Sequence, residues 1–489
     1  MDNGEPLEHL DVLVVGAGLS GIGAACRLRQ KLPHHTFAVL ESRGAIGGTW
    51  DLFRYPGVRS DSDMYTLGYS FRPWRGGKAI AQGADIREYV TETAREFGVE
   101  ERVRFHHRVL AADFSRATAR WTVVVERPRA GGGSETVRLT CSFLLSCTGY
   151  YRYDEGYTPE FPGAGEFGGR IVHPQHWPTD LDTTGRRVVV IGSGATAVTL
   201  VPNLARDAEH VTMLQRSPSW VLALSSRDHL ADRLRGRVPE GLAYALVRTK
   251  HIALATATYQ FTRRWPRRAR EVLRERVAAR LPEGFDVERH FTPDYDPWDQ
   301  RVCFVPDGDL FRALRSGRAS VVTDGIETFT PTGIRLTSGA ELPADVVVTA
   351  TGLNLLFLGG MALSVDGEPV DPADRVTYKG MMLSGVPNLA FALGYTNASW
   401  TLKIDLVTEH VCRLLALMQR RSHRIVVPRE PAAGQREPLI DLDSGYVRRA
   451  AGLLPSQGGA TPWRLHQNYP LDVVGLRHRR VDDTALEFS

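Results

Sequence analysis

The most regular feature of the sequence is a short apolar run that ends at a glycine, and it occurs twice. Residues 11–15 (Asp-Val-Leu-Val-Val) lead directly into Gly16, and residues 187–191 (Arg-Val-Val-Val-Ile) lead directly into Gly192. Continuous apolar runs of this length are typical of parallel strands that are buried on both faces. A segment with helical periodicity and then a second strand follow each run. The pattern therefore predicts two strand–turn–helix–strand units, one at the start of the chain and one before its middle.

The region between the two units has a different pattern. Apolar runs at 121–125 and 136–139 flank three glycines at 131–133. Strand-like runs separated by a glycine-rich turn are typical of hairpins. We expect a small antiparallel meander here, followed by a separate strand at 143–146.

The second half of the chain alternates between helical and strand-like segments. From about residue 225 to residue 280 the pattern is helical and rich in arginine, and strands return at 321–323 and 345–349. An amphipathic helix is predicted at 402–418. The segment after Pro428 lacks clear periodicity and is expected to wrap around an existing lobe. The second unit is therefore expected to be interrupted by a helical insertion.

Composition and charge exclude several classes of protein. The 489 residues, with 43% hydrophobic and 24% charged residues, are typical of a globular chain with more than one lobe. A net charge of +4 is too small to indicate nucleic acid or an anionic membrane as the main partner. Five cysteines without a CxxC pair disfavour a disulfide scaffold, a metal site or a dithiol centre and favour a cytoplasmic setting. The acidic start does not resemble a signal peptide, and no run is long enough for a membrane span.

The first glycine turn, residues 16–21, matches the pattern GxGxxG between a buried strand and a helix. In this context Gly16, Gly18 and Gly21 permit a tight turn and a close approach of the backbone to a pyrophosphate at the helix N-terminus. Glu41 ends the second strand, where a carboxylate can bind ribose hydroxyls. The unit predicts a dinucleotide site, and the complete strand–helix–strand context disfavours the alternative of a glycine turn without a ligand.

The second glycine turn has the related form GxGxxA, with Gly192, Gly194 and Ala197 at the three defining positions. Here the second strand is followed by Arg216 and Ser217 in place of an acid. A guanidinium and a hydroxyl suit a 2′-phosphate, which a carboxylate would repel, so NADP is favoured over NAD. The alternative for Arg216 is a solvated surface cation.

Two dinucleotide sites with different strand ends imply two cofactors, FAD in the first lobe and NADPH in the second. We therefore expect an α/β protein with two Rossmann-like dinucleotide-binding domains, the NADP domain carrying the helical insertion. Crossings between the lobes are expected near Gly149 and Gly352, where 144–149 and 345–352 look like the connecting segments of two-dinucleotide-domain flavoproteins. The expected division is 1–149 and 352–489 for FAD, 150–224 and 300–351 for NADP, and 225–299 for the insertion.

Two longer motifs indicate what the flavin does. The first comprises Gly47-Gly48-Thr49-Trp50, Tyr55-Pro56-Gly57 and Asp61, and the second, at 167–178, is FxGxxxHxxxWP. Both resemble the fingerprints of type I Baeyer–Villiger monooxygenases, which are class B flavoprotein monooxygenases. The resemblance implies that Trp50 belongs to the FAD site. Without the resemblance, tryptophans such as Trp50 and Trp177 are more often packing residues than chemical ones. A histidine such as His173 more often orders a linker than transfers a proton.

A third segment, Trp298-Asp299-Gln300-Arg301-Val302-Cys303, follows the helical insertion. In the family an arginine at this point lies over the flavin and pairs with the aspartate that closes the first fingerprint, so Arg301 and Asp61 are the implied catalytic pair. A permanent cation stabilises the negative charge that develops as oxygen is transferred. The structural alternative for Arg301 is a salt bridge between lobes. Family members often carry lysine immediately before this arginine, and Gln300 removes that cation here.

The amino-acid sequence resembles one branch of the family in four segments, at 48–65, 173–202, 378–403 and 461–469. Members of this branch also oxidise sulfur in thioamides and thioethers. The resemblance implies an NADPH- and O2-dependent conversion of ketones to esters or lactones through a C4a-peroxyflavin. The expected partners are O2 and a small ketone or thioether. The pocket is expected to be lined by the helical insertion and by loops near 355–361 and 394–400.

Three rival functions share parts of this pattern. An N- or S-oxidising flavin monooxygenase has both glycine turns but does not need Arg301. A dithiol reductase is disfavoured because CxxC is missing. A flavin-binding sensor without turnover would oxidise NADPH slowly and independently of substrate.

The run Arg-Arg-Trp-Pro-Arg-Arg at 263–268 could mark a membrane surface or an acidic partner. Membrane-surface helices also present a sustained apolar face. The sequence pattern shows no such face, so we expect a solvated helical surface.

Overall fold

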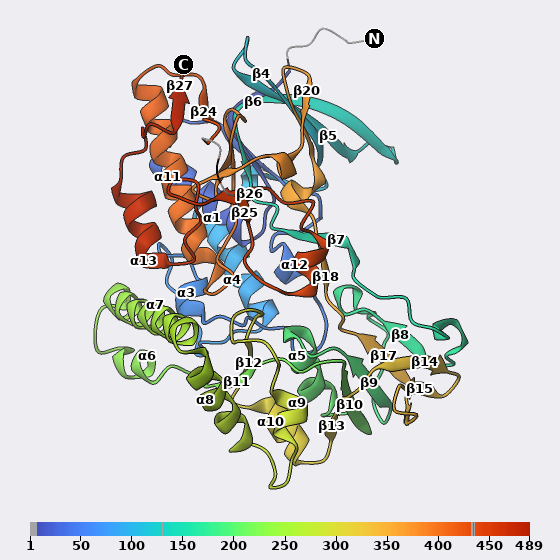
Figure 1. Cartoon of the computed structure of the whole chain (residues 1–489). Coiled ribbons are helices and arrows are strands. Elements are labelled where there is room, and N and C mark those ends of the chain that lie inside the picture. Colours follow the sequence, from blue (N-terminus) through green and yellow to red (C-terminus); the bar gives the residue numbers. More distant parts are fainter. Residues whose placement is uncertain (1–6, 130, 432–433, 435) are drawn as a thin grey trace.

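In the computed structural model the chain forms two lobes (Figure 1), and the structure describes residues 7–129, 131–431, 434 and 436–489. The upper lobe in Figure 1 contains the blue and red parts of the chain, and the lower lobe contains the green and yellow middle. The acidic start considered above, residues 1–6, lies outside the described residues. No helix within the described ranges combines the length and the apolar composition that crossing a bilayer requires.

The upper lobe is built on a nine-stranded sheet. Its strands are β1 (His9–Val15), β2 (Phe37–Leu40), β3 (Val103–Arg104), β4 (Arg108–Ser115), β5 (Arg120–Pro128), β6 (Ser134–Ser146), β19 (Ala362–Val365), β20 (Glu368–Val370) and β23 (Leu389–Phe391). Hydrogen-bonded neighbours follow the order β20-β19-β4-β5-β6-β1-β2-β3, and β23 also pairs with β6. The strands β3, β2, β1, β23 and the end of β6 are parallel, whereas β4, β5 and β6 form an antiparallel meander.

Strand β1 separates two cores. Its Val12 and Val14 pack towards the helices α1 (Leu19–Lys31), α4 (Gly83–Glu96) and α11 (Trp400–Arg420), and Leu13 and Val15 pack towards the meander. The apolar run at 11–15 is therefore buried on both faces, as predicted. The expectation of a separate strand at 143–146 is wrong, because β6 is continuous from the meander into the parallel part of the sheet. The physical reason is that residues 137–146 contain no glycine, proline, asparagine or aspartate to break the strand.

The lower lobe is built on a parallel sheet of five strands in the order β13-β10-β9-β17-β8. These strands are β8 (Arg170–Val172), β9 (Arg187–Ile191), β10 (His210–Gln215), β13 (Ala319–Thr323) and β17 (Val346–Thr349). The helices α5 (Ala195–Leu204) and α10 (Asp309–Arg315) pack on one face of the sheet. The other face is covered by an antiparallel sheet of β14 (Ile326–Thr330), β15 (Gly333–Leu336) and β16 (Glu341–Pro343).

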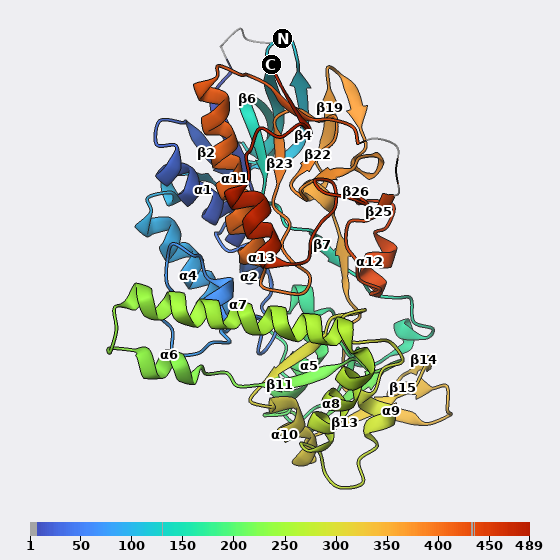
Figure 2. The ribbon, with the colours of Figure 1, turned by 60° about the vertical axis from the view of Figure 1, so that its left-hand side comes forward.

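The arginine-rich segment is helical, as predicted, and connects β11 (Val221–Leu224) with β12 (Cys303–Pro306), which are paired in parallel. Its helices are α6 (His229–Leu234), α7 (Glu240–Arg264), α8 (Pro266–Ala278) and α9 (Val287–Phe291). Helix α7 runs across the front of the molecule in Figure 2, and it packs on the short helix α3 (Met64–Leu67) of the upper lobe.

A two-stranded antiparallel ribbon connects the lobes, formed by β7 (Tyr151–Gly156) and β18 (Leu353–Leu355). After α11 the chain packs on the upper lobe through short elements. These are β24 (Val426–Pro428), β25 (Arg436–Pro438), α12 (Gly445–Arg449), β26 (Ser456–Gly458), α13 (Tyr469–Asp472) and β27 (Leu486–Phe488). Strands β24 and β27 pair with each other, as do β25 and β26. Leu476 and Leu486 from this segment are buried with α1 and α11.

Candidate active site

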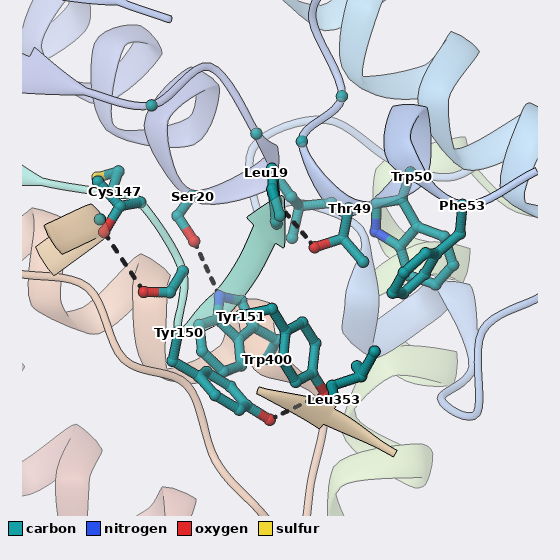
Figure 3. Close-up of a pocket in the computed structure, with 18 of the residues that line it drawn as sticks. Leu19, Ser20, Thr49, Trp50, Phe53, Cys147, Tyr150, Tyr151, Leu353 and Trp400 are labelled. Atoms are coloured by element: carbon teal, nitrogen blue, oxygen red, sulfur yellow. Dashed lines mark hydrogen bonds between the residues drawn. The ribbon is translucent and has the colours of Figure 1, made fainter. Parts of the chain in front are cut away.

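A cavity of about 520 Å³ lies where the two lobes meet. The upper lobe supplies most of its wall, and the lower lobe adds the first turn of α5 and the segment around Arg301. Figure 3 shows part of this wall, in which aromatic side chains face the glycine turn that precedes α1. A cavity shared by two dinucleotide-binding folds is the usual place for a bound ligand in such proteins.

The first glycine turn forms one end of the cavity through Gly16 and Gly18. Gly16 has a φ of +101°, and a Cβ atom there would lie 2.7 Å from the carbonyl oxygen of Cys147. A Cβ atom on Gly21 would lie 1.7 Å from the carbonyl oxygen of Gly16. Both positions therefore require glycine, and the close packing leaves the N-terminus of α1 open towards the cavity.

Glu41 follows β2 and also lines the cavity. It is buried, and its Oε2 accepts a hydrogen bond of 2.8 Å from the backbone N–H of Ala17, within the glycine turn. Its Oε1 accepts from the backbone N–H of Arg43 at 2.9 Å. Oε1 also accepts from the hydroxyl of Ser42 at 3.4 Å, whereas Oε2 keeps a further lone pair, so Glu41 can accept from a ligand hydroxyl while it holds the turn.

Aromatic residues build the opposite wall (Figure 3). Trp50 lies in the short helix α2 (Thr49–Leu52) and lines the cavity. Trp400 donates its indole N–H to the hydroxyl of Ser20 at 2.8 Å and stacks on Tyr150 with 5.2 Å between ring centroids. The hydroxyl of Tyr150 lies 3.2 Å from that of Tyr151. The sequence gives no motif for Tyr150 and Tyr151, although the expected loops near 355–361 and 394–400 do reach the wall.

Arg301 and Asp61 are brought together on this cavity. The Arg301 Nη1 lies 3.1 Å from the Asp61 Oδ2, although 240 positions separate the two residues. The Arg301 Nε is buried without a hydrogen-bond partner among the described residues, which leaves a donor for a ligand. Burial alone would lower the pKa of Arg301, but the oxygens of Tyr150, Tyr446 and Asp61 outweigh it and raise that pKa above its usual value. The guanidinium is therefore a fixed positive charge.

The glycines of the second turn, at the end of β9, do not line this cavity, although Ala195 and Thr196 of the same turn do. Gly192 has a φ of +134°, and a Cβ atom there would lie 2.4 Å from the carbonyl oxygen of Ala350. Gly194 precedes α5 and has open space where a Cβ atom would stand, and Ala197 is fully buried. The turn thus has the same form as the first one, with its second glycine facing open space.

Arg216 and Ser217 follow β10 and are exposed. The hydroxyl of Ser193, inside the second glycine turn, donates to the carbonyl oxygen of Ser217 at 3.0 Å. Within the part of the chain that the structure describes, Arg216 has no carboxylate within 4.0 Å. Its guanidinium is therefore available to a ligand that reaches this edge of the lower sheet.

His173 holds the connection between the lobes. Its Nδ1 accepts from the backbone N–H of Gln175 at 3.2 Å, and its Nε2 lies 3.2 Å from the carbonyl oxygen of Gly352. This arrangement assigns the proton of a neutral ring to Nε2, and burial lowers the pKa of His173. The side chain of Gln175 donates to two carbonyl oxygens of β7, at 2.9 and 3.0 Å. The geometry favours linker ordering over proton transfer for this residue.

The helical insertion does not line the cavity. None of the wall residues comes from 225–299, all of which the structure describes. The expectation that this segment shapes the pocket directly is therefore wrong. The reason is that α7 rests on the outer side of α3, where the buried Arg248 donates to the carbonyl oxygens of Tyr65 and Gly68 at 2.6 and 2.8 Å. Helix α7 therefore supports the cavity wall indirectly, through its contact with α3.

His251 of α7 is a second contact between the insertion and the upper lobe. Its Nδ1 lies 3.3 Å from the Asp63 Oδ2, and its Nε2 lies 2.7 Å from the Asp228 Oδ2. Burial alone would lower the pKa of His251, but these two carboxylates outweigh it and hold the pKa above its usual value. Asp63 caps α3, two positions after Asp61, so the charged ring couples α7 to the loop of the first fingerprint.

This contact predicts a pH-dependent stability. A histidine whose pKa is raised by folding stabilises the native state. This stabilisation is fully present when the pH is below the pKa of histidine in the unfolded chain, about 6.5, and it is lost as the pH rises through the pKa of the folded state. His251→Gln is expected to cost about 2 kcal/mol at acidic pH and progressively less at alkaline pH. The melting temperature, followed by flavin release from pH 6 upwards, measures this difference. His34→Gln changes an exposed histidine and is expected to leave the pH profile unchanged.

The fold and the site together define a flavoprotein monooxygenase of the class with two dinucleotide-binding domains. Residues 14–76 match the family described as NAD(P)-binding Rossmann-like domain, and residues 79–232 match the family described as Flavin-binding monooxygenase-like. The structure is similar to that of an oxidized steroid monooxygenase bound to NADP, with a TM-score of 0.75, 22% identity, and coverage of 98% of this chain and 99% of that one. A polycyclic ketone monooxygenase from Thermothelomyces thermophila is similar at a TM-score of 0.74 and 19% identity, over 100% and 91% of the two chains. The expected fold class is confirmed.

Sequence relatives narrow the class to a family. The chain is 54% identical over 484 residues to the FAD-containing monooxygenase EthA of Mycobacterium tuberculosis, which covers 99% of this chain and 98% of that protein. It is 51% identical over 488 residues to the putative FAD-containing monooxygenase MymA of the same species, with 99% and 98% coverage. The chain belongs to this family of FAD-containing monooxygenases and is an oxidoreductase. The predicted resemblance to a branch of FAD-containing monooxygenases is thereby confirmed.

Proposed function

We propose that this chain converts ketones to esters or lactones, consuming NADPH and O2, and that it also oxidises sulfur in thioethers. The observation that carries the proposal is the ion pair between Arg301 and Asp61 on the wall of the cavity between the lobes. An N- or S-oxidising monooxygenase has no need of a fixed cation at this place. The proposed substrate is a small ketone or thioether.

The residues of the upper lobe fit FAD. Gly16, Gly18 and Gly21 provide a turn into which no side chain projects, Glu41 provides an acceptor for ribose hydroxyls, and Trp50 provides an aromatic wall. When bound, FAD supplies the transfer of one oxygen atom from O2 to the substrate. The polypeptide supplies the binding, the orientation and the electrostatic field.

The proposed role of Arg301 is to stabilise negative charge on the substrate. When oxygen adds to a ketone, negative charge develops on the substrate carbonyl oxygen, and a guanidinium that is already in place stabilises it without reorganisation. Asp61 orients this guanidinium through the Nη1 atom and leaves the buried Nε free among the described residues. Arg301 is the proposed catalytic residue, and Asp61 is the residue that positions it.

The lower lobe fits NADPH. The turn formed by Gly192, Gly194 and Ala197 accepts the pyrophosphate at the N-terminus of α5, and Arg216 and Ser217 accept the 2′-phosphate. Solved structures of OTEMO are titled as complexes with FAD and NADP and share this fold, with a TM-score of 0.74 at 21% identity. We propose the corresponding division of the chain, with FAD domain at 1–149 and 352–489, NADP domain at 150–224 and 300–351, and insertion at 225–299.

Arg216→Ala is expected to lower kcat/KM for NADPH by about 10- to 100-fold, because a charge-assisted hydrogen bond to the phosphate is lost. The value for NADH is expected to stay nearly unchanged. Steady-state NADPH and NADH oxidation with a saturating ketone measures both. Arg186→Ala, at the opposite end of β9, is the matched control. Equal losses with the two nucleotides would contradict the assignment.

Product analysis tests the proposed function as a whole. Purified protein, NADPH and O2 are incubated with linear, cyclic and aromatic ketones and with one thioether, and the products are identified by mass spectrometry. Esters or lactones that contain one added oxygen atom support the proposal. Sulfoxide as the sole product would assign the chain to the sulfur-oxidising alternative. We also propose a cytoplasmic location, in keeping with the five cysteines, which are all free and buried.

A further inference from the structure

Over residues 241–262, helix α7 carries its basic residues on the side that faces the protein. Between Gly241 and Thr262 its basic side chains are Arg248, Lys250 and His251, and it has no acidic one. Arg248 is buried against carbonyl oxygens of the upper lobe, and both Lys250 and His251 contact Asp228. The inner face of this helix therefore carries charges beside the buried Tyr244 and Val247, whereas an ordinary surface helix carries its charges on the outer face.

The outer face of α7 is apolar and uncharged. Leu242, Leu246 and Leu254 expose 51%, 47% and 60% of their surface. The exposed positions between 241 and 262 are Gly241, Leu242, Ala245, Leu246, Thr249, Ala253, Leu254, Ala255, Ala257, Thr258 and Gln260. This uncharged face extends for about 30 Å along the helix. The arginine run is exposed, as expected, but the neighbouring turns of α7 also expose leucines, which the sequence pattern does not reveal because the interleaved basic residues point inward.

A basic cluster lies at the end of this face. Arg264, Arg267 and Arg268 are exposed, and none has a carboxylate within 4.0 Å among the described residues. Trp265 lies between them with 49% of its surface exposed. Tryptophan prefers the interface between lipid and water, and unpaired arginines bind lipid phosphates.

We propose that the outer face of α7 and its basic end form a docking surface for an anionic lipid bilayer. The leucines would enter the acyl boundary, and the arginines would meet the negatively charged headgroups. A second copy of the chain fits less well. Parallel helices would place two arginine clusters together, and antiparallel helices would place each cluster against Glu240, whose carboxylate is already paired with Arg75 at 2.8 Å.

This surface lies close to the candidate active site. The inner face of α7 packs on α3, whose Leu67 lines the cavity, and Arg263 at the end of α7 pairs with Asp299 at 2.6 Å, two positions before Arg301. Docking through the outer face would therefore hold the cavity beside the bilayer. The binding itself does not depend on which reaction the cavity carries out.

Vesicle binding tests the proposal. The full-length, FAD-loaded protein is sedimented with vesicles of phosphatidylcholine, with and without phosphatidylglycerol, at low and high salt. We expect binding only with phosphatidylglycerol, and weaker binding at high salt. Leu246→Ser combined with Leu254→Ser is expected to weaken binding about tenfold or more. Arg264→Gln, Arg267→Gln and Arg268→Gln together are expected to weaken it about 100-fold.

Matched changes elsewhere serve as controls. Leu453→Ser alters a leucine that is 56% exposed on another part of the surface, and Arg186→Gln, Arg206→Gln and Arg335→Gln together remove the same charge from exposed positions. Both are expected to bind like the parent protein. Flavin content and melting temperature verify that each variant is folded, and the arginine triple decides the question if the serine pair unfolds. Absence of binding to phosphatidylglycerol vesicles, or binding that neither α7 variant weakens, overturns the proposal. A dimer that the serine pair dissociates, without vesicle binding, also overturns it and assigns the face to a second copy.

Discussion

Arg301→Ala is expected to lower kcat for ketone oxygenation by about 10³-fold while FAD remains bound. The guanidinium lines the cavity and is held by Asp61 at 3.1 Å, so its removal leaves the charge on the substrate oxygen without a fixed counter-charge. Because the glycine turn and Glu41, which we propose to contact FAD, are untouched, flavin absorbance should be unchanged. Ester or lactone formation, measured by mass spectrometry alongside NADPH oxidation, separates oxygen transfer from reduction.

Two further variants sharpen this test. Arg263→Ala removes another paired arginine, whose partner Asp299 is close to Arg301 in sequence, but Arg263 does not line the cavity. It is expected to retain activity. Arg301→Lys keeps a positive charge without the forked geometry and is expected to recover only part of the rate. Full ketone oxygenation by Arg301→Ala would show that the ion pair is a structural link between the lobes.

The buried strands could be predicted from the sequence because their pattern is local. The runs at 11–15 and 187–191 are apolar at every position that must face a core, and both become central strands. The continuity of β6 was less accessible, because the parallel and antiparallel pairings of one strand depend on partners that are distant in sequence. The pairing of a strand depends on the elements packed beside it, and the pattern of the strand's own residues does not show which elements these are.

The candidate site was predictable only in part, for a related reason. Arg301 and Asp61 were paired through the resemblance to a family, since no local rule connects residues 240 positions apart. The sequence does not single out Tyr150 or Tyr151, because single aromatic residues have no motif, although Tyr150 stacks in the cavity wall on Trp400 from the expected loop at 394–400. The outer face of α7 was missed because Arg248, Lys250 and His251 look like surface residues until their partners are known.

Gly21→Ala is expected to abolish FAD binding. A methyl group at this position would lie 1.7 Å from the carbonyl oxygen of Gly16 and 3.4 Å from the Cβ of Cys147, so α1 must move away from β1. Both elements are fully buried here, and a close-packed core does not absorb such a shift. The turn that places the N-terminus of α1 towards the cavity is lost with it. We expect at least a tenfold lower ratio of flavin to protein, measured by absorbance after gel filtration, because the pyrophosphate contacts depend on this turn.

Gly194→Ala provides the matched control in the second turn. Gly194 has a φ of −80° before α5, and a Cβ atom there meets no protein atom within 4 Å, so the fold and the FAD content should be retained. The added methyl group would instead stand where the backbone approaches the pyrophosphate of NADPH, and KM for NADPH is expected to rise. The two substitutions add the same methyl group, at the third position of the first motif and at the second position of the second motif, so the readout is which cofactor each one affects. A Gly21→Ala protein that purifies with full FAD would refute the assignment of the first turn, and loss of FAD from Gly194→Ala would refute the separation of the two sites.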